Sequence, residues 1–330
     1  MKGTSFTYRK GGLALRSMLL FLFAGSLLFS CDEKPKKTNF DQEELLIEIP
    51  NFNADSAYEY VAKQVAFGPR VPNMGSHINC GEWLGKFLED KGAKVFRQTA
   101  VLTAWDGTQL SGQNIIAQYN PEAKKRIILS AHWDTRPIAD QDTERQDEPI
   151  LGANDGASGV GVLLEIARQI QAKKPSVGID ICLWDAEDYG NPGTVNSYSL
   201  GTQYWAKNKH VPNYNAAFGI NLDMVGAAGA QFFKEENSMT YAAAIVEKVW
   251  LSARRQGYGS YFSHVRSNAV TDDHFYVSKL AGIPCIDVID QKNGADFFEQ
   301  WHTHGDNMEV ISKETLKAVG QTVLDVIYRE

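Results

Sequence analysis

Cysteine is scarce in this sequence, with only four among 330 residues. Cys31 closes an apolar N-terminal segment, whereas Cys80, Cys182 and Cys285 are dispersed through apolar surroundings. Three scattered cysteines do not form the disulfide framework that supports many small secreted domains. We therefore expect Cys80, Cys182 and Cys285 to be buried thiols of the core.

The sequence also lacks an excess of positive charge. Lys and Arg number 33 against 40 Asp and Glu, so the formal net charge is −7 at pH 7. A nucleic-acid-binding protein needs basic residues to neutralise phosphates, so we expect no nucleic-acid partner. Hydrophobic residues make up 43% and charged residues 22% of the chain. This balance is typical of a globular protein with a large core.

The main apolar run is too short for a comfortable transmembrane helix. It covers residues 18–30, MLLFLFAGSLLFS, and follows several basic residues, which is the pattern of a secretory signal. Its end, LLFSC, resembles the lipobox of bacterial lipoproteins, although Phe29 is bulkier than usual there. We expect residues 1–30 to be a lipoprotein signal peptide and Cys31 to be lipidated. The alternatives are a signal peptide cut elsewhere and an uncleaved anchor.

A polar segment separates this region from the fold. Residues 31–39, CDEKPKKTN, lack periodicity and are expected to be a flexible tether. Residues 40–330 are expected to form one domain, because no linker divides them. The protein would then be extracytoplasmic and lipid-anchored to a bacterial membrane, on the periplasmic side or the cell surface. The N-terminal lipid would be its only membrane contact.

Apolar periodicity alternates between strands and helices along the domain. Strand patterns occur at 94–102, 113–120, 126–132, 178–184, 216–226 and 282–290. Helical spacing occurs near 54–66, 78–91, 159–170, 199–208, 238–256, 273–280 and 313–328. This alternation predicts an α/β fold, a single-domain α/β/α sandwich with a mostly parallel mixed central sheet.

Three carboxylates are crowded where the strand at 178–184 ends: Asp185, Glu187 and Asp188. Neighbouring like charges and burial both raise carboxyl pKa values, so the cluster is unfavourable unless basic groups, solvent or a metal ion compensate it. A polar turn is the plain alternative. Open α/β sheets bind ligands beyond the carboxyl ends of their strands, so the other strand ends decide between these interpretations.

More acids and histidines are expected at the same edge. Strand ends carry His132 and Asp134 in SAHWD and Asp223 in NLDMVG, while loops carry Asp155 in GANDGASG and His302 in QWHTHGDN. Singly, Asp155 could cap a helix, His302 could be a surface residue and Asp223 a turn residue. Together, carboxylates and imidazoles at several strand ends are what a hydrolase-type zinc site with an open position needs.

The order of these motifs resembles a known family. H-x-D, N-D-G-A-S-G, D-A-E-D, L-D-M-V-G, V-T-D-D-H and W-H-T follow one another as in the zinc aminopeptidase-like superfamily, family M28 of clan MH. The animal-type (type II) glutaminyl-peptide cyclotransferases are the most similar branch. The resemblance covers roughly residues 55–328. It implies an aminoacyltransferase that converts N-terminal Gln of peptides or proteins to pyroglutamate and releases ammonia.

The resemblance implies a role for each matching residue. One zinc per chain would be bound by Asp155, Asp188 and His302, with the substrate in the fourth position. Glu187 would be the general acid/base. Asp185, two residues earlier, would point elsewhere as a structural residue.

Three further residues complete the expected site. Asp272, the first acid of D-D-H, would hydrogen-bond near Glu187, and we count both as catalytic. Trp301 would wall the substrate pocket, which Asp223 would also line. Trp301 in W-H-T-x-x-D-N favours the cyclase branch, although it could also be an ordinary core aromatic.

A dinuclear zinc aminopeptidase is the alternative function. In that case a second metal would be bound by His132 and Asp223, and all five ligand positions of such a site carry competent residues. Two departures from the animal cyclases are also visible. Position 188 is Asp where they have Glu, and YGNPGTVNSYSLG lacks their gating Trp. Preference beyond the first substrate residue is therefore not implied.

Overall fold

The computed structural model describes residues 47–330, and its centre is a six-stranded sheet. The strands are β1 (Lys94–Thr103), β2 (Gln109–Tyr119), β3 (Arg126–His132), β4 (Gly178–Trp184), β5 (Phe218–Asp223) and β8 (Cys285–Ile289), in the spatial order β1-β2-β4-β3-β5-β8. The last four in this spatial order run parallel, whereas β2 is antiparallel to both β1 and β4. The predicted mixed, mostly parallel sheet is confirmed.

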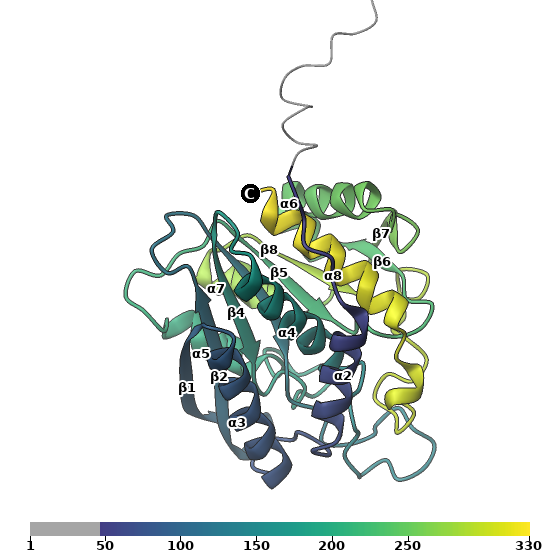
Figure 1. The fold of residues 1–330 in the computed structure, drawn as a ribbon. Helices are drawn as coiled ribbons and strands as arrows, with labels where there is room; N and C mark the ends of the chain where they lie inside the picture. Colours follow the sequence, from purple (N-terminus) through teal and green to yellow (C-terminus); the bar gives the residue numbers. More distant parts are fainter. Residues whose placement is uncertain (1–46) are drawn as a thin grey trace, which may run out of the picture. The chain divides into compact units, whose positions relative to one another are not determined.

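Alternate residues of the central strands pack into two separate cores, because successive side chains point to opposite faces of a sheet. Ile127 and Leu129 belong to the larger core, whereas Ile128 belongs to the smaller one. The larger core lies under four helices, which stand in front of the sheet in Figure 1: α2 (Ala54–Val65), α3 (Gly75–Asp90), α4 (Ala157–Ala172) and α8 (Lys313–Tyr328). The smaller core lies under α5 (Leu200–Lys207) and α7 (Asp273–Ala281). The predicted α/β/α sandwich is therefore confirmed.

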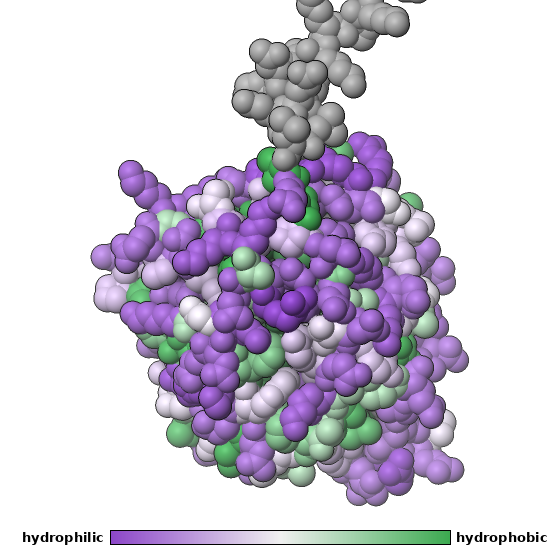
Figure 2. Space-filling model, in the orientation of Figure 1, coloured by the Kyte–Doolittle hydropathy of each residue, from purple (hydrophilic) through white to green (hydrophobic). Residues whose placement is uncertain are grey.

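The surface agrees with this layering. The face seen in Figure 2, over the front helices, is mainly hydrophilic with scattered apolar residues.

Cys80, Cys182 and Cys285 are buried and free, as predicted. Within residues 47–330, no helix has both the length and the apolar character needed to cross a bilayer. The predicted signal peptide, tether, Cys31 and the domain start at residue 40 lie outside the described residues.

The sequence-based prediction missed a second, two-stranded sheet formed by β6 (Phe232–Glu235) and β7 (Phe262–Ser267). Neither strand alternates between buried and exposed residues: β6 is buried throughout, and residues 264–266 of β7 are all exposed. The signal on which the prediction relied is therefore absent from both. Between them runs α6 (Glu236–Arg255), which packs against α8 and β8.

Candidate metal and active site

The polar residues gather where the parallel strands end. His132 and Asp223 are the last residues of β3 and β5, and Asp188 follows β4. Because parallel strands all end at one edge of the sheet, side chains from three different chain segments meet there. The expectation that these residues share one edge is therefore met by the topology.

Two glycines let the loop that carries Asp155 approach this edge closely. A Cβ atom at Gly156 would lie 2.6 Å from the carbonyl oxygen of His132, and one at Gly159 would lie 2.2 Å from that of Leu222. Any side chain at either position would therefore force the loop or α4 away from the strands. Gly156 is the N-cap of α4 and makes no side-chain cap. The alternative that Asp155 caps this helix is wrong.

Asp155, Asp188 and His302 form one group that could hold a metal ion. Their ligand atoms lie within 4.8 Å of one another, and all three residues are buried. His302 Nε2 lies 3.2 Å from Asp188 Oδ1 and 3.8 Å from Asp155 Oδ2. Asp188 Oδ2 is buried and accepts no hydrogen bond from any described residue. Two carboxylates and one imidazole with an unused buried oxygen are a donor set that fits zinc.

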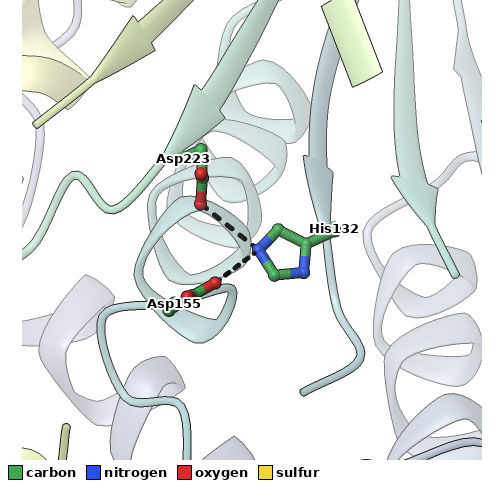
Figure 3. A group of neighbouring side chains, drawn as sticks. All are labelled: His132, Asp155 and Asp223. Atoms are coloured by element: carbon green, nitrogen blue, oxygen red, sulfur yellow. Dashed lines mark hydrogen bonds and ion pairs between the residues drawn. The ribbon is translucent and has the colours of Figure 1, made fainter. Parts of the chain in front are cut away.

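His132, Asp155 and Asp223 form a second such group. Figure 3 shows that both carboxylates point at the same ring nitrogen of His132. Its Nε2 lies 2.9 Å from Asp155 Oδ1 and 3.2 Å from Asp223 Oδ1. Burial and the nearby Asp155 carboxylate raise the pKa of Asp223 to about 7. Asp155 therefore belongs to both groups, with one oxygen toward each histidine.

Two residues that the sequence analysis did not identify orient His302 and Asp188. Asp140 Oδ1 lies 3.0 Å from His302 Nδ1, and Arg136 contacts both oxygens of Asp140 at 3.0–3.1 Å. Arg136 also donates to the carbonyl oxygens of Asp188 and Gly190. Carboxylate–histidine pairs of this kind fix the ring of a metal ligand. Although burial opposes the charge, Asp188 and Asp140 raise the pKa of His302 to about 9.

Asp134 and Asp306 hold the loop backbones of the site. Asp134 accepts the backbone N–H groups of Glu187 and Asp188 at 3.0 and 3.1 Å. Asp306 accepts those of Asn154 and Asp155 at 2.7 and 3.0 Å. Neither belongs to a metal-binding group among residues 47–330. The sequence could have suggested Asp306, which lies four residues after His302, but not its partners.

Glu187 is buried in the same pocket without belonging to either metal group. Its Oε1 accepts a hydrogen bond from Ser199 Oγ at 3.2 Å. Burial, together with the negative charge of Asp272, raises the pKa of Glu187 well above the ordinary value. A carboxyl group with a raised pKa can accept a proton and return it during a reaction. Asp185 instead lies 2.9 Å from His77 Nε2, so it points away from the pocket, as expected.

The pocket at this edge has a volume of about 420 Å³. Glu187, Asp272 and Asp223 line it, together with the aromatic residues Tyr198, Phe297 and Trp301. The Trp301 ring stacks on the His302 ring, with 3.7 Å between the ring centroids. Trp301 is therefore a wall of the pocket, and it also packs against a small buried cluster that includes Ile289 and Phe298. A cavity of about 470 Å³ between α3 and the strands β1 and β2 contains none of the predicted site residues.

Comparison with known proteins finds relatives with the same fold. Residues 114–327 match peptidase family M28. The glutaminyl cyclase of Bacteroides thetaiotaomicron, solved with N-acetylhistamine, is 53% identical, with a TM-score of 0.84 over 86% of this chain and 100% of that chain. A Zn-dependent exopeptidase of Parabacteroides distasonis is 56% identical, with a TM-score of 0.83 and the same coverage. The family resemblance and the fold are thereby confirmed.

More distant relatives also include cyclases and peptidases. The glutaminyl-peptide cyclotransferase of Drosophila melanogaster is 26% identical over 75% of this chain and 73% of its own length. Aminopeptidase YwaD of Bacillus subtilis is 27% identical over 79% of this chain. The chain spans only 54% of that aminopeptidase.

Proposed function

The chain belongs to peptidase family M28, and we propose that it is a zinc-dependent glutaminyl-peptide cyclotransferase. It would convert N-terminal Gln of peptides or proteins to pyroglutamate and release ammonia. The likeness to a glutaminyl cyclase over that enzyme's whole length supports this function. The observation that carries it is the position of Glu187, which is buried in the pocket beside the metal groups and has a raised pKa. A cyclisation needs one such group to move a proton between two nitrogens of the same substrate.

Glu187 and Trp301 have different roles in the proposed reaction. Glu187 takes a proton from the α-ammonium group, so that the free amine attacks the γ-carbonyl carbon of the Gln side chain. The bond to the amide nitrogen then breaks. Glu187 passes to that nitrogen first the proton taken from the ammonium group and then the extra proton of the attacking nitrogen, so the ring nitrogen keeps one hydrogen and the released ammonia leaves as ammonium. Trp301 walls the pocket and keeps the side chain folded against the amine. No water is consumed.

We propose that Asp155, Asp188 and His302 hold one zinc ion. Asp188 Oδ2 has no hydrogen-bond partner among the described residues, and His302 Nε2 faces the carboxylates of Asp188 and Asp155. Asp140 and Arg136 hold these ligands from behind. Bound zinc would polarise the γ-carbonyl group and stabilise the negative charge on its oxygen.

One observation favours the dinuclear aminopeptidase as a second candidate. Asp155 places one oxygen near each histidine, so it could contribute a ligand atom to both metal groups. In the cyclase, by contrast, His132 serves as a hydrogen-bond donor. Its Nε2 already has Asp155 and Asp223 within hydrogen-bond distance.

Metal content separates the two candidates. Elemental analysis of the purified protein should give about one zinc per chain, and Asp223→Asn should still hold one. A zinc content of two per chain in the wild type and one per chain in Asp223→Asn would contradict the single-zinc site and favour the peptidase. Zinc absent from both proteins would contradict either function.

We further propose that the protein is a lipid-anchored, extracytoplasmic enzyme. Residues 18–30 and Cys31 carry the lipoprotein pattern. Glu48 pairs with Lys173, which follows α4 and precedes β4, at 2.8 Å. The described chain therefore begins near the edge of the sheet opposite the pocket. A strand of 7 residues, such as β4, separates these two edges by about 23 Å.

A further inference from the structure

A buried group of charges lies behind the pocket wall and takes no part in the steps above. His274, in the first turn of α7, is completely buried. Its Nε2 lies 3.1 Å from Glu235 Oε2, and its Nδ1 lies 3.3 Å from Asp287 Oδ2 and 4.0 Å from Asp272 Oδ2. Three buried carboxylates from β6, β8 and the start of α7 therefore face one imidazole ring.

A second layer of hydrogen bonds fixes two of these carboxylates. Asn221 Nδ2 donates to Asp272 Oδ2 at 2.7 Å and to Asp287 Oδ1 at 3.3 Å. Ser130 Oγ donates to Asn221 Oδ1 at 2.7 Å, which fixes the orientation of the amide. Ser130 and Asn221 each lie two residues before a strand end of the site. The charge group is thus built into the sheet directly beneath the pocket.

The same group also holds the loop that lines the pocket. Residues 268–272 form one wall. Glu235 Oε1 accepts the backbone N–H of Val270 at 2.8 Å, and Asn237 Nδ2 donates to the carbonyl oxygen of Val270 at 2.7 Å. Glu235 therefore contacts both the His274 ring and the loop that ends in Asp272.

Charge balance explains why a histidine occupies this position. Burial opposes protonation, but Asp287, Asp272 and Glu235 together raise the pKa of His274 well above its ordinary value. In return, despite burial, His274 lowers the pKa of Asp272. The ligand atoms of Asp272, His274 and Asp287 would also fit around a metal ion. We assign them to an ion-paired cluster because the imidazolium supplies the compensating positive charge.

We propose that His274 is a positioning residue that, with Glu235 and Asp287 behind it, holds the Asp272 carboxylate and the 268–272 loop against the pocket. This inference rests on the function proposed above. His274 does not line the pocket and would touch no substrate atom. It acts through Asp272, which lines the pocket together with Glu187.

The test is His274→Gln in the full chain. The amide can still donate from the place of Nε2 to Glu235, but the positive charge that faces Asp287 and Asp272 is lost. Cyclisation of a Gln-initiated peptide should fall in kcat by about 10- to 100-fold, by analogy with the loss of activity when a residue that supports a metal ligand is removed. KM and zinc content should change little. The matched control is His264→Gln, at an exposed position on β7, which should behave as the wild type.

A double-mutant cycle distinguishes positioning from a general loss of stability. In an Asp272→Asn background, His274→Gln should lower kcat less than about twofold further, because the contact it supports is already gone. The inference would be overturned if kcat of the double mutant fell by the product of the two single-mutant losses. It would also be overturned if His274→Gln alone kept kcat within about twofold of the wild type. If His274→Gln does not fold, Asp287→Asn is judged by the same criteria. A wild type that cyclises no peptide refutes the proposed function and this inference with it, whereas an active wild type with unaffected variants refutes the inference alone.

Discussion

Replacing Glu187 with Gln removes one protonatable oxygen and changes little else. The side chains have nearly the same shape, and an amide oxygen can still accept the hydrogen bond that Ser199 Oγ donates to Glu187 Oε1 at 3.2 Å. Glu187 lies outside both metal groups, so the variant should keep its zinc. The substitution therefore tests proton transfer with the pocket intact.

The expected loss follows from the role of the group. General acid/base catalysis contributes about 10²- to 10⁴-fold in rate, which corresponds to about 2.7–5.5 kcal/mol of activation free energy. Because Glu187 is buried, we expect the upper half of this range. The loss should appear in kcat, while KM for a Gln-initiated peptide stays close to that of the wild type.

The pH profile gives a second readout of the same group. As a base Glu187 must be deprotonated, so kcat/KM of the wild type should fall as pH drops below its pKa. Burial and the Asp272 charge raise that pKa above the ordinary 4.5, so the fall begins at a higher pH than for an exposed Glu. The acid limb should disappear in Glu187→Gln and persist in the control Glu309→Gln, at an exposed position. A zinc-loaded Glu187→Gln that turns over at the wild-type rate would refute the role of Glu187.

Two further perturbations test the pocket wall and the anchor. Trp301→Ala removes a ring that stacks on His302 and lines the pocket, so KM should rise by roughly twofold to tenfold, for about 0.5–1.5 kcal/mol of lost aromatic contact, while zinc is retained. An unchanged KM would mean that the ring does not contact substrate. Cys31→Ser should release the enzyme from the membrane fraction without changing its turnover, because Cys31 precedes the described domain. A variant that stays with the membrane would contradict lipidation.

The site residues that the sequence predicted best are those at the ends of strands with a clear apolar pattern. His132 and Asp223 end strands whose apolar runs are clear, so their place at the site edge followed from parallel topology. Asp155 and His302 lie in loops, and only the order of the motifs connected them with the strand ends. Asp140 and Ser199 also contact site residues, but no period or motif marks them.

The sequence analysis identified Asp272 but not the other members of the charge group around His274. Glu235 lies far from Asp272 along the chain, in β6, which shows no alternation. Apolar periodicity identifies buried positions by their hydrophobic residues, so it does not detect a buried position that carries a charged residue. Such groups become visible only when the fold brings the segments together.

The central claim is that this pocket cyclises an N-terminal Gln instead of hydrolysing a peptide bond. The direct measurement is mass spectrometry of two peptides after incubation with the enzyme, one beginning with Gln and one with Leu. The Gln peptide should lose one ammonia and keep every residue, because its amine and side-chain amide are held together in the pocket. The Leu peptide should stay intact, because it has no side-chain amide to attack. Release of the first residue from the Leu peptide would contradict the cyclase and favour the dinuclear aminopeptidase.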